Sequence, residues 1–249
     1  MKIILASKSG VRKEILDKNN IKCEVMPSNV DEDQVKESLQ SEKASPELIS
    51  KNLAELKANK ISKKQPDSYV IGADSVIDLK GKLISKPKNR EEALNILKDL
   101  NGKEHQLISS VCISKNGSMI WNYTDASKLT MKELNLEEIR SYLKKIKDKE
   151  LYAYGVYQIE AGGRYLFSKI EGDENSIMGL PIQKIKDYAK AQFITFNPPQ
   201  KKQFIPISIA ADQIKHEAYP TVIEQMLDWF FEEGGCEVFS CDKDEEIPF

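Results

Sequence analysis

The opening of this 249-residue chain, residues 2–16, constrains the fold more than any other stretch. An apolar run at residues 3–5 is followed by a hydroxyl-rich loop at residues 7–10, after which apolar residues recur at helical spacing. This pattern predicts a strand, a tight turn and a helix. The free N–H groups at the start of such a helix, with Arg12 in its first turn, favour a bound phosphate.

The same pattern also describes an ordinary strand–helix connection, so a second feature has to support a site. Gly72-Ala73-Asp74-Ser75 places a carboxylate and a hydroxyl at the end of another apolar run, residues 69–71. Two polar clusters, each following a predicted strand, favour a binding site over a plain connection.

Composition is typical of a soluble globular protein, with 31% charged and 40% hydrophobic residues. No apolar run approaches the roughly 20 residues that span a bilayer, and the short apolar stretch at the N-terminus does not resemble a secretory signal. We therefore expect a cytoplasmic protein without a membrane partner. The four cysteines match no zinc or redox spacing, so reduced thiols are expected.

The charge is distributed unevenly along the chain. Residues 196–249 carry 4 Lys against 11 Asp and Glu, whereas the preceding residues carry 33 basic and 28 acidic groups. Together with the linker-like Asn197-Pro198-Pro199, this predicts two domains, 1–195 and an acidic extension of unknown role at 196–249. The mildly basic body suits a small polyanionic ligand, and no basic run is dense enough to predict a nucleic-acid partner.

Hydrophobic periodicity predicts strands alternating with helices and hairpins, hence a mixed α/β fold. The hairpins are expected at Lys80-Gly81 and at Asn116-Gly117. Residues 29–33 are expected to form a polar loop. Strands are predicted at 3–5, 22–26, 69–71, 106–114, 118–128, 165–170 and 204–210, and helices at 11–16, 46–62, 90–100, 137–146, about 181–191 and 216–233.

The usual strong catalytic motifs are absent, including the P-loop, the dinucleotide fingerprint, HExxH and GxSxG. Neither histidine, His105 or His216, has acidic or cysteine neighbours at ligand spacing, and His105 is expected to be a structural hydrogen-bonding residue. The polar residues that remain at element ends each also fit an ordinary solvated surface. Together they supply cations for phosphates and carboxylates for a hard divalent ion, without a nucleophile, which favours metal-assisted phosphoanhydride hydrolysis. They are Ser7, Ser9, Arg12, Asp31, Glu32, Lys57, Asp74, Ser75 and Lys86.

Over roughly residues 2–190 the sequence resembles the Maf family of nucleoside triphosphate pyrophosphatases, also known as septum-formation inhibitors. The family's opening signature, Leu-Ala-Ser-x-Ser-Pro-Arg-Arg-x-Glu-Leu-Leu, stands here as residues 5–16. Further matches, in the family's order, are Val30-Asp31-Glu32, Leu53-Ala54-x-x-Lys57-Ala58, Val70-Ile71-Gly72-Ala73-Asp74-Ser75, Ser85-Lys86-Pro87, Gly102-x-x-His105, Tyr157-Gln158-Ile159-Glu160, Ile170-Glu171-Gly172 and Gly179-Leu180-Pro181.

The resemblance implies hydrolysis of a nucleoside triphosphate between its α- and β-phosphates, releasing a nucleoside monophosphate and pyrophosphate. It implies Asp74 as the catalytic carboxylate, acting as general base or holding a Mg²⁺ or Mn²⁺ ion, and Glu32 as a further metal-site carboxylate. The implied fold is an elongated mixed β-sheet flanked by helices, like that of the inosine triphosphatases, with a central cleft between two lobes. The implied substrate-binding residues are Ser7, Ser9, Arg12, Lys57 and Lys86.

Three positions that the family uses to choose the base depart from its usual residues: Val11, Ser75 and Glu160. Val11 replaces one of two arginines. Glu160 resembles the branch that acts on 7-methyl-GTP, because a carboxylate accepts hydrogen bonds from a guanine edge. We therefore expect a modified or non-standard substrate, with 7-methyl-GTP favoured over dTTP and UTP.

Two other interpretations stay open at this point. The lost arginine at Val11 also fits a nucleotide-binding regulator of cell division with little or no turnover. A nucleic-acid-binding module fits poorly, because the chain lacks a basic surface interleaved with aromatic residues. A homodimer is one assembly open to the chain.

Overall fold

The computed structural model describes residues 2–159 and 162–192, and the chain divides into two compact units, Met1–Asp187 and Tyr188–Phe249. Nearly all described residues belong to the first unit, which contains every described strand. The linker, strand and helix predicted beyond residue 196 lie outside the described residues, as does Glu160.

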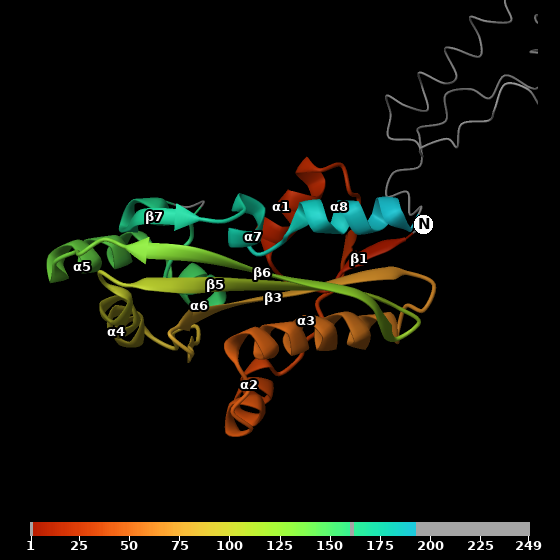
Figure 1. Cartoon of the computed structure of the whole chain (residues 1–249), viewed down its shortest axis with the longest axis horizontal. Coiled ribbons are helices and arrows are strands. Elements are labelled where there is room, and N and C mark those ends of the chain that lie inside the picture. Colours follow the sequence, from red (N-terminus) through yellow and green to blue (C-terminus); the bar gives the residue numbers. More distant parts are fainter. Residues whose placement is uncertain (1, 160–161, 193–249) are drawn as a thin grey trace, which may run out of the picture. The chain divides into compact units, whose positions relative to one another are not determined.

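Seven strands in the described part of the chain form one mixed sheet (Figure 1). Six strands follow the order β2-β1-β3-β5-β6-β7, and β4 pairs with β3 alone. The pairs of β1 with β2 and β3 are parallel, and the other pairs are antiparallel. The strands are β1 (Ile3–Leu5), β2 (Glu24–Val25), β3 (Tyr69–Leu79), β4 (Lys82–Ile84), β5 (Glu104–Lys115), β6 (Ser118–Met131) and β7 (Phe167–Glu171).

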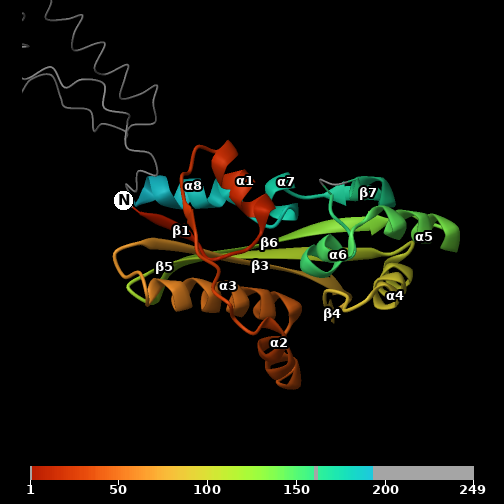
Figure 2. The ribbon, with the colours of Figure 1, turned by 180° about the vertical axis from the view of Figure 1, so that it is seen from behind.

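Helices cover both faces of this sheet, so the predicted mixed sheet flanked by helices is confirmed. Figures 1 and 2 show α3 along one face and α1, α7 and α8 along the other, with α2 beyond α3 and α4 and α5 at the far end of the long strands. The helices are α1 (Gly10–Lys18), α2 (Glu32–Ser41), α3 (Pro46–Ser62), α4 (Arg90–Leu100), α5 (Leu136–Lys145), α6 (Asp148–Tyr154), the 3₁₀ helix η1 (Gly163–Leu166), α7 (Glu174–Ile177) and α8 (Ile182–Ala191). None of the described helices is both long and apolar enough to cross a membrane.

Local sequence explains the elements that frame the centre of the sheet. The Ser45 hydroxyl caps α3 by accepting from the N–H of Leu48, and Pro46 occupies the first turn. The hairpin between β5 and β6 turns at Asn116 and Gly117, which both have positive φ. These features confirm the predicted helix at 46–62 and the predicted hairpin.

Gly72 lets α3 lie directly against β3. A Cβ atom at Gly72 would lie 2.3 Å from the carbonyl oxygen of Ala54 and 2.7 Å from the backbone nitrogen of Ala58. Any side chain at this position would therefore push the helix away from the sheet. The close approach brings Lys57, on α3, next to Asp74, on β3.

Two expectations about local structure were wrong. Asp74 and Ser75 do not follow a strand but lie in the middle of β3, because β3 stays paired with β5 on both sides of Asp74. Glu32 does not lie in a loop but begins α2, whose N-cap is Asp31: the Asp31 carboxylate accepts from the N–H of Gln34 at 3.1 Å.

Candidate active site

A cavity of about 640 Å³ opens beside the middle of β3. Its walls include side chains from two buried apolar groups. One group includes side chains of α3, β1 and β3 and contributes Ala6 to the wall. The other includes side chains of α4, α5 and β5 and contributes Leu107, Tyr157 and Ile177. The cavity therefore lies between these two parts of the core, as expected for the predicted central cleft.

The charged residues around the cavity are mostly cations. Among the described residues that line it, two are acidic, Glu32 and Asp74, and six are basic. A cavity lined in this way attracts polyanions. The basic residues are Lys8, Arg12, Lys36, Lys57, Lys86 and Lys149.

The turn between β1 and α1 forms one side of the cavity and has the predicted strand–turn–helix structure. Ser9 is the N-cap of α1, and its hydroxyl accepts from the N–H of Arg12 at 3.4 Å. The Ser7 hydroxyl, which is buried, accepts from the N–H of Ser9 at 3.2 Å. These bonds fix the turn before any ligand binds.

The guanidinium of Arg12 joins this turn to β3 and to the loop before α8. Its Nη1 donates to Ser7 Oγ at 3.2 Å and to the carbonyl of Ala73 at 2.9 Å, its Nη2 donates to Ser75 Oγ at 3.1 Å, and its Nε donates to the carbonyl of Gly179 at 2.9 Å. Burial lowers the pKa of Arg12, whereas the charges of Asp74 and Glu32 act to raise it. Four of the five guanidinium donors are thus used within the protein, and one remains for a ligand.

At the centre of the site, the Lys57 ammonium lies between two carboxylates. Its Nζ is 2.6 Å from Asp74 Oδ1 and 2.7 Å from Glu32 Oε1. The side chains of Lys57 and Asp74 are almost fully buried, at 7% and 6% exposed, while that of Glu32 is 29% exposed. The second carboxylate oxygen of Asp74, Oδ2, is buried and has no hydrogen-bond partner among the described residues.

Lys86 extends this network toward solvent, with its Nζ 3.7 Å from Glu32 Oε2. Burial acts to raise the pKa of Glu32, but the charges of Lys57, Lys86 and Lys36 and the hydrogen bond from Lys57 outweigh it and hold that pKa at about 2. Burial lowers the pKa of Lys86, and Glu32 and Asp74 oppose this shift. Glu32 is therefore an ionised carboxylate near pH 7.

The carboxylates fit a divalent ion of the Mg²⁺ type. Lys57 occupies one oxygen of each, which leaves the unpartnered Asp74 Oδ2 and the Glu32 Oε2 that faces Lys86 at 3.7 Å. Mg²⁺ in enzymes is commonly held by one or two carboxylates together with substrate phosphates and water. Across the described ranges, no group of three or more His, Cys, Asp or Glu side chains is close enough to hold a metal.

Part of the cavity lining is apolar and aromatic, and it includes Tyr152, Val156, Tyr157 and Met178. The Tyr157 hydroxyl forms a 2.9 Å hydrogen bond with Nε2 of His105, and burial raises the pKa of Tyr157. Burial lowers the pKa of His105 to about 4, so the imidazole is neutral. This confirms His105 as a structural hydrogen-bonding residue that fixes the cavity wall.

Nearly all the residues expected from the sequence therefore surround one cavity. Lys36, Lys149 and Gly179 also line the cavity, but the sequence did not predict them as site residues. Lys36 lies one helical turn after Glu32, a relation that would have been visible had α2 been predicted. The expected residues that line the cavity are Ser7, Ser9, Val11, Arg12, Glu32, Lys57, Asp74, Ser75 and Lys86.

Comparison with known proteins identifies the family to which the chain is similar. The Maf-like protein family matches residues 2–192. Over 130 residues, the chain is 74% identical to the nucleoside triphosphate pyrophosphatase of Pelagibacter ubique (strain HTCC1062), a match covering 52% of this chain and 67% of that protein. Over 133 residues, it is 36% identical to the 7-methyl-GTP pyrophosphatase of Brucella abortus biovar 1 (strain 9-941), covering 53% and 67%.

Other curated relatives named nucleoside triphosphate pyrophosphatase are matched over 65% of their length, among them that of Ruegeria sp. (strain TM1040), which is 39% identical. The solved structure of a nucleoside-triphosphatase, or dITP/XTP pyrophosphatase, from Mycobacterium abscessus covers 80% of this chain and 98% of its own at 12% identity, with a TM-score of 0.36. The enzyme class expected from the sequence is the one that the curated relatives' names carry. The family match spans more than half of the chain, so this chain belongs to the Maf family.

Proposed function

We propose that this protein is a nucleoside triphosphate pyrophosphatase that hydrolyses the bond between the α- and β-phosphates. Water adds to the α-phosphorus, the bond to the bridging oxygen breaks, and a nucleoside monophosphate, pyrophosphate and a proton are released. The observation that carries the proposal is the Asp74–Lys57–Glu32 cluster in a cavity with six basic residues. The names of the family's curated relatives support the same reaction.

Asp74 is proposed as the catalytic carboxylate, because the residue lines the cavity and its Oδ2 has no hydrogen-bond partner among the described residues. The Lys57 ammonium donates to Oδ1, which leaves Oδ2 to accept a proton from water or bind a metal. A Mg²⁺ or Mn²⁺ ion held by Asp74 and Glu32 would neutralise phosphate charge and activate the water when bound. The hydroxyl-lined turn at Ser7 and Ser9, with the remaining N–H of Arg12 and the ammonium of Lys86, would bind the phosphates.

The apolar wall around Tyr152 and Tyr157 is the proposed site of the base. We propose a preference for guanine nucleotides methylated at N7 over dTTP and UTP, from Glu160 and from the 36% identity to a protein named 7-methyl-GTP pyrophosphatase. A higher kcat/KM for dTTP or UTP would refute this preference.

The test is pyrophosphate release by the purified full-length protein from a panel of nucleoside triphosphates with Mg²⁺, Mn²⁺ or EDTA. Release should require the divalent ion and should stop with EDTA. Full release in EDTA would refute the metal-assisted mechanism. Nucleotide binding without release, in the presence of either ion, would instead support the regulator of cell division, which the replacement of one family arginine by Val11 favours.

A further inference from the structure

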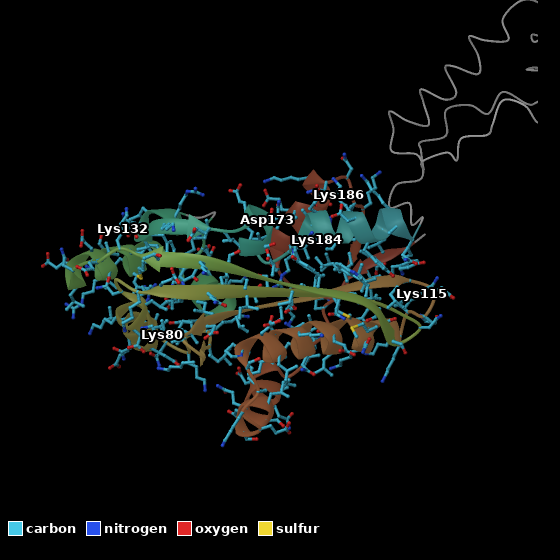
Figure 3. All side chains as sticks on the ribbon, in the orientation of Figure 1. Lys80, Lys115, Lys132, Asp173, Lys184 and Lys186 are labelled. Carbon is cyan, nitrogen blue, oxygen red and sulfur yellow. The ribbon has the colours of Figure 1, made fainter. Side chains whose placement is uncertain are left out.

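Helix α2 buries a single side chain, and that side chain is a lysine. Lys36 is 7% exposed, although the helix lies on the outer side of α3, away from the sheet (Figures 1 and 2). Lysines such as Lys80 and Lys132 are exposed and lie at the periphery (Figure 3), and the buried Lys57 is paired with two carboxylates. The burial of Lys36 therefore needs a reason.

Lys36 lines the cavity but has no partner there in the part of the chain that the structure describes. No hydrogen bond or ion pair joins its ammonium to another group of that part, and both nearby carboxylates are already held by Lys57. The charge of Lys36 nevertheless acts on its neighbours, because it helps to lower the pKa of Glu32 and the pKa of Lys86. Lys36 thus adds positive charge to a wall that is already rich in cations.

The stem of Lys36 is buried, while its ammonium, which has no counter-charge among the described residues, is available to an anion that enters the cavity. From this geometry we infer that Lys36 is a substrate-binding residue: it donates to the phosphate chain of the triphosphate and to the pyrophosphate product. The inference rests on the proposed function, because it assumes that a phosphate chain enters this cavity. If Lys36 instead only packs its aliphatic stem against α3, phosphate binding does not need its charge.

The experiment uses the full-length protein and inorganic pyrophosphate with Mg²⁺, followed by calorimetric titration. Lys36→Met should weaken pyrophosphate binding about 10- to 100-fold, the effect of losing a hydrogen bond to a charged group. The KM for the triphosphate should rise by a similar factor. Lys36→Arg, which keeps the charge, should restore most of the affinity.

The melting temperature is a second measurement, and it distinguishes a role in phosphate binding from a role in packing alone. Without ligand, Lys36→Met should leave the melting temperature within about 2 °C of wild type, because methionine keeps the buried stem and the ammonium has no partner to lose among the described residues. Lys51→Met is the matched control, since Lys51 is an exposed lysine of the adjacent α3 that does not line the cavity. It should change neither the affinity nor the KM. Lys36→Gln serves the same titration if the methionine variant does not fold.

The outcomes separate this inference from the proposed function. If wild-type protein releases pyrophosphate from nucleotides but Lys36→Met binds pyrophosphate as tightly as wild type, the role of Lys36 is refuted and the function stands. A lower melting temperature for Lys36→Met, with unchanged affinity, would assign the lysine to packing. A wild-type protein that neither binds nor releases pyrophosphate would refute both.

Discussion

Replacing Lys57 by methionine tests whether this ammonium holds the two carboxylates of the site together. In the wild-type protein its Nζ is 2.6 Å from Asp74 and 2.7 Å from Glu32. The substitution leaves Asp74, only 6% exposed, as a buried charge without its cation. Removing one partner of a buried ion pair typically costs about 3–5 kcal/mol. Glu32 adds less to this loss, because it is 29% exposed and keeps Lys86 nearby.

The assay is urea denaturation at pH 7.5 of wild type, Lys57→Met, Asp74→Asn and the double variant. We expect Lys57→Met to lose about 3–5 kcal/mol of the free energy of unfolding. Lys57→Met with Asp74→Asn should recover part of that loss, since the buried charge is removed with its partner, giving a coupling energy of up to about 3 kcal/mol. Lys51→Met, an exposed lysine on the same helix, is the control and should lie within about 0.5 kcal/mol of wild type.

Two results would refute this reasoning. A loss below about 1 kcal/mol for Lys57→Met would mean that water or another group replaces the ammonium at little cost. A double variant no more stable than Lys57→Met would mean that Asp74 is not the group left without a partner.

Three further predictions concern Asp74, His105 and the segment after residue 192. Asp74→Asn should lower kcat by about 10²–10⁴-fold with circular dichroism unchanged, and retention of more than about a tenth of the activity would contradict its role. Burial lowers the pKa of His105 from its ordinary 6.5 to about 4. Between these pH values only the unfolded chain binds the proton, because the folded imidazole stays neutral. The free energy of unfolding should therefore fall by up to about 3 kcal/mol as the pH drops from 6.5 to 4. Urea denaturation at several pH values should show this slope flattened in His105→Gln, and an unchanged slope would refute it. A chain ending at residue 192, where the family match ends, should keep pyrophosphatase activity, and a folded but inactive truncation would assign part of the site to the extension.

The elements that the sequence predicted well are those fixed by local chemistry. The turn between β1 and α1, the N-cap of α3 at Ser45 and the hairpin at Asn116 all depend on residues within a few positions of one another. Helix α2 could not be found in the same way, because its buried residue is Lys36 rather than an apolar residue at helical spacing. The extent of β3 beyond Asp74 depends on pairing with β5, whose partners, from Ser109 for Ser75 to Gln106 for Asp78, lie 34 to 28 residues later in the chain.

The site was predictable as a set of residues but not as an arrangement. Residue chemistry and family motifs both predicted Lys57 and Asp74 as site residues, yet their 2.6 Å contact depends on the close packing of α3 against Gly72, which no local pattern reveals. The contact between Arg12 and the carbonyl of Gly179 spans 167 positions of the chain. Only the folded sheet brings these segments together.

The arrangement also determines which hydrogen-bond donors of the site remain for a ligand. Lys57 gives two of its three donors to carboxylates, and Arg12 gives four of its five to protein oxygens, so each retains one N–H for a ligand. These bonds hold the carboxylates, hydroxyls and carbonyls of the site in place. Around them, Lys86 shares Glu32 with Lys57, and Lys36 has no counter-charge within the described part of the chain. A triphosphate, with its own negative charge and many acceptor oxygens, is the kind of ligand that such a surplus of donors can bind.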